Sequence, residues 1–459
     1  MFEGLLKKAL QQGATYADLR HQTISSHGLE MRNGKIERAI GGQEEGIGIQ
    51  VLYKGGWGFY ATNMATLSAL DGALRDALTS AKAAAKHIGT KNKLADDEPR
   101  TAKTLWKPKK DPANVDSKEK EEVVRVMHGA VKEQKEVKST TGSYGDRTVH
   151  QVFYSSEGSR VETQITRSVA QVHFIARADG RVTSRRIRVG AAAGFELFTD
   201  VDVEKKAREA AESTIRLLRA PAAPSGRMTV VTDQELTGVF SHEAVGHASE
   251  GDLVAAGESC LQGKIGEKIG SQLVTLVDDG TIKGSFGSAP YDDHGVPMQR
   301  RVLVEKGVFK RYLTDRVAGG KLGFKSSGSA RAESYSSRPL VRMTNTFIEK
   351  GDLSFKELLE DVKEGVYAVG SRGGQVDTAK GSFQFSAQEA YRIRKGRIVG
   401  PLRDVSLTGF TLETLSNIDG VSKEWALGDP GYCGKGQYVP VGDGGPHLRI
   451  RNAIVGGTA

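Results

Sequence analysis

The sequence predicts an α+β protein, with an N-terminal α/β domain of hairpins and helices followed by a β-rich C-terminal domain. Glycine is abundant: 56 glycines in 459 residues accompany only 12 prolines, which indicates many tight turns rather than low-complexity disorder. Apolar and polar residues alternate along 15–62 and 142–198 with the two-residue period of strands. Alanine-rich or strongly charged segments interrupt these stretches and are typical of helices.

The N-terminal region begins with an expected amphipathic helix over residues 2–12. Strands follow, and two turns interrupt them, at 32–35 and at 53–56. The first turn contains Asn-Gly, the pair that best fits a two-residue hairpin. An alanine-rich segment over 65–87 predicts a long helix that ends near Gly89.

The lysine-rich segment 91–116 predicts a connection, and a sub-boundary of the first domain is possible there. After it, the expected elements are a helix capped by Ser117 that runs to about residue 138, strands over 142–198 with turns at 156–158 and 178–180, and a helix over 201–219.

A run of alanine, proline, serine and glycine over 220–226 is the clearest break in the chain. We therefore expect two domains, 1–220 and 227–459. The second begins with an apolar strand over 228–232, after which Thr232-Asp233-Gln234-Glu235 resembles a capping box that opens a helix. Short strands and glycine turns then dominate, apart from one expected helix over 354–363.

The composition is that of a soluble globular protein, with 38% hydrophobic and 26% charged residues. No apolar run approaches the ~20 residues of a membrane helix, and the N-terminus lacks the pattern of a signal peptide. Two cysteines cannot build a disulfide framework, so we expect a cytoplasmic protein with no membrane partner. A net charge of +9 permits an acidic partner but is mild for this length.

The most informative motif is Ser-His-Glu-Ala-Val-Gly-His at 241–247. It places two imidazoles, His242 and His247, around the carboxylate of Glu243. Neutral imidazoles bind Zn²⁺, and a neighbouring carboxylate can take a proton from metal-bound water. The alternative is a capping or core histidine pair without a metal.

The spacing of the two histidines has a geometric consequence. On a regular α-helix, residues five apart diverge by about 140°, so His242 and His247 cannot easily share one ion. A π-bulge makes an i,i+5 pair behave like an i,i+4 pair. We therefore predict a π-type widening over 244–246, where Gly246 tolerates distortion best.

Two imidazoles leave a catalytic zinc one protein ligand short. The candidates for a third ligand are Cys433, Cys260, His294 and Glu250. Cys433 lies in a glycine-rich loop, and Lys435 nearby favours its deprotonation. The residues alone leave this choice open.

In combination, these segments resemble the TldD/PmbA family of zinc metallopeptidases, specifically its metal-binding TldD-type members. The matching segments, in order along almost the whole chain, are 241–247, 250–252, 278–281, 295–297, 312–315 and 433–437. The resemblance implies that His242, His247 and Cys433 are the zinc ligands and that Glu243 is the general base. His294 departs from the acidic residue expected before that glycine, and is either an extra substrate contact or a surface histidine.

The expected function is zinc-dependent hydrolysis of small or unfolded peptides bound in extended form, with Glu243 as general base on metal-bound water. A thiolate ligand weakens the Lewis acidity of zinc, which predicts a slow peptidase. The resemblance also implies a PmbA/TldE-like partner subunit in a heterodimer, although a homodimer is possible.

Two other functions are compatible with parts of the sequence. The lysine cluster over 103–110 suggests a nucleic-acid-associated regulator, as in the gyrase modulators described in this family, but the chain has no helix-turn-helix, finger or aromatic-basic stripe. We therefore do not expect nucleic acid as a partner. The intact histidine and glutamate motif disfavours a non-catalytic chamber subunit.

Overall fold

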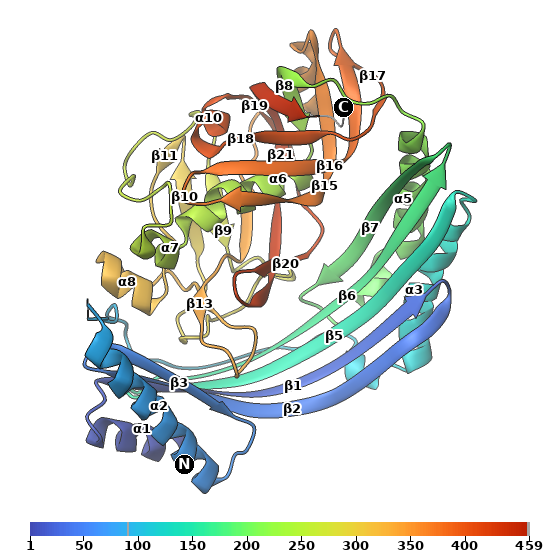
Figure 1. Cartoon of the computed structure of the whole chain (residues 1–459). Coiled ribbons are helices and arrows are strands. Elements are labelled where there is room, and N and C mark those ends of the chain that lie inside the picture. The colour runs from blue at the N-terminus through green and yellow to red at the C-terminus, as the bar shows by residue number, and fades with distance from the viewer. Residues whose placement is uncertain (90, 457–459) are drawn as a thin grey trace.

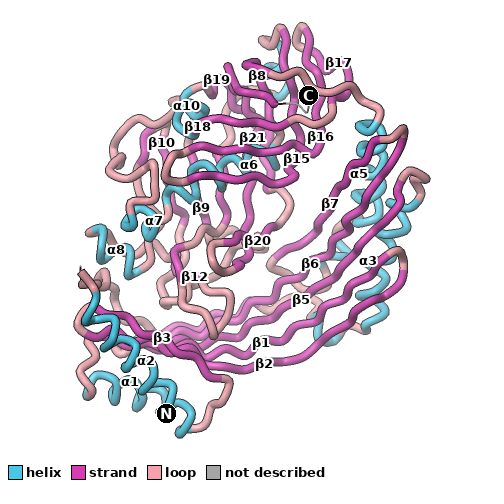
Figure 2. Tube along the Cα trace, viewed as in Figure 1, coloured by secondary structure: helices cyan, strands magenta, loops and turns pink. Residues whose placement is uncertain are grey.

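The computed structural model describes residues 1–89 and 91–456, so residues 457–459 of the predicted C-terminal domain lie outside it. Two sheets organise the chain. The first has seven strands and curves around the second, which has twelve strands and lies on the concave side of the first (Figure 1). The fold is α+β, as predicted, and strands outweigh helices throughout (Figure 2).

The first sheet is built mainly of long antiparallel strands joined by tight turns. Its order is β3-β2-β1-β5-β6-β4, with β7 also paired to β6. The strands are β1 (Tyr16–Arg32), β2 (Lys35–Tyr53), β3 (Gly56–Thr62), β4 (Thr101–Trp106), β5 (Val137–Ser155), β6 (Arg160–Ala178) and β7 (Arg181–Ala191). The predicted Asn-Gly turn connects β1 to β2, and both of its residues have positive φ, 49° at Asn33 and 81° at Gly34, as a two-residue hairpin requires.

Helices cover the first sheet in two separate groups. Near one end, α1 and α2 pack on β1 and β2 through a core that includes Leu6, Leu19 and Leu74. Near the other, α3 and α5 pack on β5, β6 and β7 through a second core. The helices of this region are α1 (Phe2–Gln11), α2 (Leu67–His87), α3 (Ser117–Lys132), α4 (Leu197–Asp200) and α5 (Val203–Leu218), with a 3₁₀ turn at Pro112–Asn114.

The segment 91–116 contains a strand that the sequence did not predict. β4 pairs in parallel with Arg160–Ile165 of β6, a long-range contact that leaves no local turn signal. The next helix is also shorter than expected, because α3 ends at Lys132. Its first residue is Ser117, and the cap is Asp116, whose side chain accepts from the Lys118 N–H.

The second sheet is built around one long C-terminal strand. β21 pairs with β8, β14, β18, β19 and β20, so segments far apart in sequence meet along it. The strands are β8 (Gly226–Thr232), β9 (Leu276–Asp279), β10 (Arg300–Glu305), β11 (Val308–Phe309), β14 (Asn345–Ile348), β15 (Glu364–Asp377), β16 (Ser382–Arg394), β17 (Arg397–Leu402), β18 (Ser406–Phe410), β19 (Ile418–Leu427), β20 (Gly431–Gly434) and β21 (Tyr438–Gly456). A separate pair consists of β12 (Ala330–Arg331) and β13 (Leu340–Val341).

Short helices fill the second region, and they include more than the two predicted, which are the helix after Thr232 and the helix near 354–363. They are α6 (Gln234–Phe240), α7 (Gly251–Ala256), α8 (Arg316–Leu322), α9 (Phe355–Glu360) and α10 (Thr411–Ser416), with a π-helix and a 3₁₀ turn after α6. At the predicted helix, Ser354 and Glu357 form a reciprocal capping box. None of the helices in 1–89 and 91–456 is both long and apolar enough to cross a membrane.

Candidate metal centre

The histidine motif lies directly after α6, which leads away from the central strands. The helix begins at Gln234, and its cap is Asp233, whose side chain accepts from the Leu236 N–H at 2.9 Å. The expected capping box starting at Thr232 is therefore wrong by one residue. The Thr232 hydroxyl instead bonds to that of Thr237 at 2.7 Å, inside the core.

The motif itself forms a π-helix over Ser241–Gly246, followed by a 3₁₀ turn over His247–Ser249. This confirms the widening that the five-residue spacing predicts. The rings of His242 and His247 are brought to a centroid distance of 5.2 Å at 89° to each other.

Gly246 is required for a different reason from the one expected. Its φ of −57° is ordinary helical backbone, which any residue adopts. However, a Cβ at this position would lie 2.0 Å from Sδ of Met343. The glycine therefore allows Met343, in the loop between β13 and β14, to pack closely against the motif, and does not supply unusual backbone freedom.

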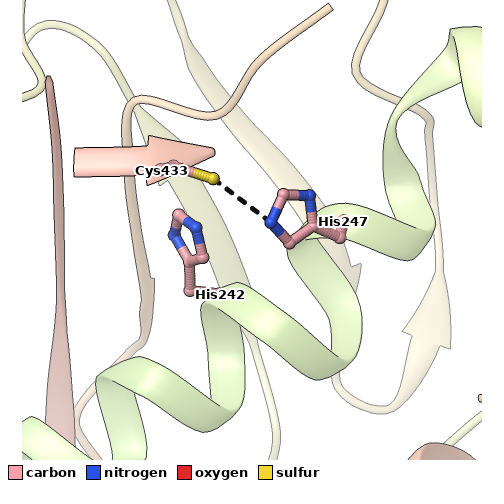
Figure 3. Close-up of side chains that lie close together, drawn as sticks. All are labelled: His242, His247 and Cys433. Carbon is pink, nitrogen blue, oxygen red and sulfur yellow. Dashed lines mark hydrogen bonds between the residues drawn. The ribbon is translucent and has the colours of Figure 1, made fainter. Parts of the chain in front are cut away.

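Cys433, on β20, completes a cluster of three donor groups. Its Sγ lies 3.2 Å from Nε2 of His247, and both imidazoles point toward it (Figure 3). One donor atom from each of His242, His247 and Cys433 lies within 4.8 Å of the others, and all three side chains are buried. The thiol is 186 positions from His247 in sequence, so only the fold brings them together.

The structure places the other candidate ligands elsewhere. Cys260 is a half-buried free thiol whose sulfur packs near Gly381. His294 is 4% exposed and lies near Gln50 of the first sheet, with 3.4 Å between the two Nε2 atoms, so the expectation of a surface histidine is wrong. Glu250 approaches the opposite nitrogen of the His247 ring, Nδ1.

Glu250 orients His247. Nδ1 of His247 donates to Oε2 of Glu250 at 2.9 Å, because a carboxylate can only accept. The proton on Nδ1 leaves the Nε2 lone pair directed at the cluster, the tautomer that a metal ligand needs. The ammonium group of Lys435 forms an ion pair with Glu250 at 3.1 Å and a second ion pair with Asp252. Lys435 thus pairs with these carboxylates, and not with the Cys433 thiol as we expected.

The electrostatics of the cluster favour a thiolate. Burial raises the pKa of the Cys433 thiol, but the charges and hydrogen bonds of His242 and His247 outweigh burial and lower that pKa to about 4. Burial likewise opposes a charged His242, yet the neighbouring thiolate raises the pKa of His242 to about 9.

These donors fit a zinc ion. Two imidazoles and one thiolate are ligand types that zinc prefers, and three protein ligands leave a coordination position for water or substrate. Nδ1 of His242 is buried and has no hydrogen-bond partner among the described residues, and a buried polar atom of this kind calls for a ligand.

Glu243 lies beside the cluster and is open to a cavity. Its side chain is 26% exposed, and Oε2 lies 3.8 Å from Nε2 of His247. The cavity has a volume of about 480 Å³ and lies between β7 and the second sheet, with Arg188, Tyr432 and Asp443 among its lining residues. A substrate in this cavity would meet the carboxylate next to the donor cluster.

Asp443 is a neighbour of the site that the sequence did not single out. It follows a glycine in β21, and burial raises the pKa of its carboxyl to about 7, with Glu243 adding to the rise. Sequence pattern alone carries no signal for this residue, since it reaches the site only through the pairing of β21.

Comparison with known proteins identifies the family of the chain. Three domain models of one family match the chain, described as PmbA/TldA metallopeptidase domain 1, central domain and C-terminal domain, at residues 17–85, 110–218 and 225–457. A metalloprotease of Methanothermobacter thermautotrophicus is 44% identical over 99% of this chain and 98% of its own.

The chain belongs to the PmbA/TldD family of metallopeptidases. Within this family it is also 30% identical to a zinc metalloprotease TldD homolog of Saccharolobus solfataricus, over 98% of this chain and 99% of that protein. Among solved structures, TldE of Thermococcus kodakarensis and a proposed modulator of a DNA gyrase from Thermotoga maritima share the fold, each with a TM-score of 0.79 and 99% coverage of both chains. Their identities are 19% and 21%.

Two of the four lysines in the cluster over 103–110 form ion pairs with carboxylates. Lys103 pairs with Glu162 at 2.8 Å, and Lys110 pairs with Glu119 at 2.7 Å. Both ion pairs reduce the charge available for phosphate contacts.

Proposed function

We propose that this member of the PmbA/TldD family hydrolyses peptide bonds in small or unfolded peptides, with His242, His247 and Cys433 as zinc ligands and Glu243 as general base. The observation that carries the proposal is the convergence of three buried donors beside a partly exposed carboxylate at the wall of a cavity. The name of the Saccharolobus solfataricus relative supports zinc as the metal.

When bound, Zn²⁺ supplies Lewis-acid chemistry that polarises the peptide carbonyl and acidifies water. In this proposal Glu243, which lines the cavity, accepts a proton from water and passes it to the leaving amine. Glu250 keeps His247 in the tautomer that leaves Nε2 free. Because all three donor side chains are buried, access of bulk water to the cluster is limited.

The walls of the cavity support binding of an extended peptide. The segments 371–374 and 429–431 line it and contain three glycines, which leave their backbone groups accessible. A peptide recognised mainly through its backbone is read with little sequence preference. We therefore expect unfolded chains to be cut and compact folded proteins to be resistant.

The partner subunit is part of the same proposal. The similarity in fold to TldE of Thermococcus kodakarensis supports assembly with a PmbA/TldE-like protein, and a homodimer is the alternative arrangement. Light scattering of the purified chain, alone and mixed with a family member that lacks the histidine motif, distinguishes the two.

The test compares the wild type with Glu243→Gln and with the control Glu258→Gln, which alters an exposed carboxylate on the loop after α7. Zinc content and cleavage of an unfolded peptide are measured for all three. The expected result is unchanged zinc in every protein and a loss of cleavage in Glu243→Gln by about a hundredfold or more. Full cleavage by Glu243→Gln would remove this residue as the base.

A further inference from the structure

A second cavity adjoins the first and is lined by arginines. It has a volume of about 180 Å³ and lies between the concave face of β5 and β6 and the loops of the C-terminal region. Tyr432, the residue before Cys433, lines both this cavity and the one that contains Glu243. The two cavities therefore share Tyr432 as part of their walls, one residue before Cys433 of the donor cluster.

Three guanidinium groups line the second cavity, and each donates hydrogen bonds to backbone carbonyls. Arg331, only 6% exposed, donates to the carbonyl of Met343 at 2.7 Å. Arg167 donates to the carbonyls of residues 286 and 288, both at 2.7 Å. Arg147 donates to the carbonyl of residue 333 at 3.1 Å. Over residues 1–89 and 91–456, none of the three forms an ion pair with a carboxylate.

The carboxylates that share the cavity are committed to backbone N–H groups. Asp292 accepts from Ala330 at 3.0 Å, and Asp293 accepts from residue 332 at 2.7 Å. Glu333 accepts from the N–H of Tyr438 at 3.2 Å. These bonds hold the loops in place, and Asp293 also pairs with Arg20 at 4.0 Å. The negative charge of Asp293 still acts on Arg167 and Arg331, but from beyond ion-pair distance.

Unpaired cations in a confined site are costly, and an anionic ligand removes that cost. Burial, together with the neighbouring positive charge of Arg167, lowers the pKa of Arg331 to about 9, so the group is still charged at neutral pH. Guanidinium groups bind carboxylates through two parallel N–H bonds, which makes them strong and directional partners. Tyr432 and Tyr438, 50% and 64% exposed, offer apolar surface beside them.

We propose that this arginine-lined cavity, between β6, β12 and β20, binds a carboxylate of the peptide substrate. This inference rests on the proposed peptidase function and adds a preference to it: a negative group, either the free C-terminus or an acidic side chain, anchors the peptide near the cutting site. Backbone recognition along the first cavity then accepts many sequences, while the arginines of the second fix the position of the cut.

The test measures binding without turnover. The zinc-loaded full chain carrying Glu243→Gln is titrated against a labelled ten-residue peptide in three forms: with a free C-terminus, with a C-terminal amide, and as an amide with aspartate at the penultimate position. We expect the free acid, or the aspartate amide, to bind about tenfold or more tightly than the plain amide. Which of the two is preferred identifies the source of the carboxylate.

Variants locate the effect in the cavity. Adding Arg331→Gln or Arg167→Gln should reduce the preference to about twofold, and Arg147→Gln, at a half-buried position, should weaken it without disturbing the core. Arg331→Lys should restore part of the preference, since charge is kept but the paired N–H groups are lost. Arg75→Gln, on exposed α2, removes the same charge elsewhere and should leave the preference intact.

Equal binding of all three peptides by the parent, or a preference that persists in both Arg331→Gln and Arg167→Gln, would overturn the inference. The peptidase proposal is judged separately, by cleavage of the same peptides with Glu243 restored. Absent cleavage with a strong carboxylate preference would remove the peptidase and leave the anion site.

Discussion

The two halves of the molecule are both rich in strands, yet they are built by different kinds of contact. In the first sheet, β1 and β2 pair over their whole length across a two-residue turn, and β5, β6 and β7 follow the same plan. In the second, β21 alone pairs with five strands that begin as early as Gly226. The proposed metal centre lies in the second half, where His247 meets a thiol 186 positions away. The residues of this candidate site are brought together by long-range pairing.

If the site depends on that pairing, losing the distant thiol should have the largest effect. We expect Cys433→Ser to lose most of its zinc and to reduce cleavage by more than about a hundredfold, because a hydroxyl is a far weaker zinc ligand than a thiolate. Zinc content by atomic emission and peptide turnover measure this. The matched control is Cys260→Ser, outside the cluster, which should keep both zinc and activity.

The second-largest effect is expected at Glu250, which hydrogen-bonds to the proposed ligand His247. In Glu250→Gln the acceptor for Nδ1 of His247 loses its charge, and Lys435 loses one of its anionic partners. We expect zinc affinity to fall by about 10–100-fold, as for other residues that orient a metal ligand. Competition with a chelator gives the affinity. Should Glu250→Gln bind zinc as tightly as Glu243→Gln does, Glu250 would have no orienting role.

A pair of glycine substitutions compares packing in the two halves directly. A Cβ at Gly246 would lie 2.0 Å from Sδ of Met343, so Gly246→Ala should destabilise the second region by about 1–3 kcal/mol. Gly129, in the exposed part of α3, has nothing within 4 Å of an added Cβ. Gly129→Ala should stabilise its helix by about 0.5–1 kcal/mol. Urea unfolding checks both, and equal midpoints would contradict the comparison.

Local signals in the sequence were enough to predict much of the first half. The Asn33-Gly34 turn, the helix over 67–87 and the turns at 156–158 and 178–180 all follow from residues that lie close together in sequence. β4 was missed because its partner is β6, more than fifty residues later, in a parallel pairing that needs no turn.

Only part of the candidate site could be predicted from the sequence. The five-residue spacing of the histidines was enough to predict the π-helix over Ser241–Gly246. The choice of Cys433 over Cys260 came from family resemblance, since composition left both possible. The sequence offers Glu250 as a candidate ligand. Its contact with Nδ1 of His247 depends on the 3₁₀ turn over His247–Ser249, which the sequence did not predict. Asp443 reaches the site through β21 alone.

The most direct test of the account is anomalous diffraction at the zinc edge from crystals of the zinc-loaded protein. We expect one strong peak within bonding distance of the two imidazoles of the motif and of Sγ of Cys433, with Glu243 beside it and outside the protein ligand set. A peak that lies away from the thiol, or no peak between these residues at saturating zinc, would contradict the claim that the π-helix and β20 together form a metal centre.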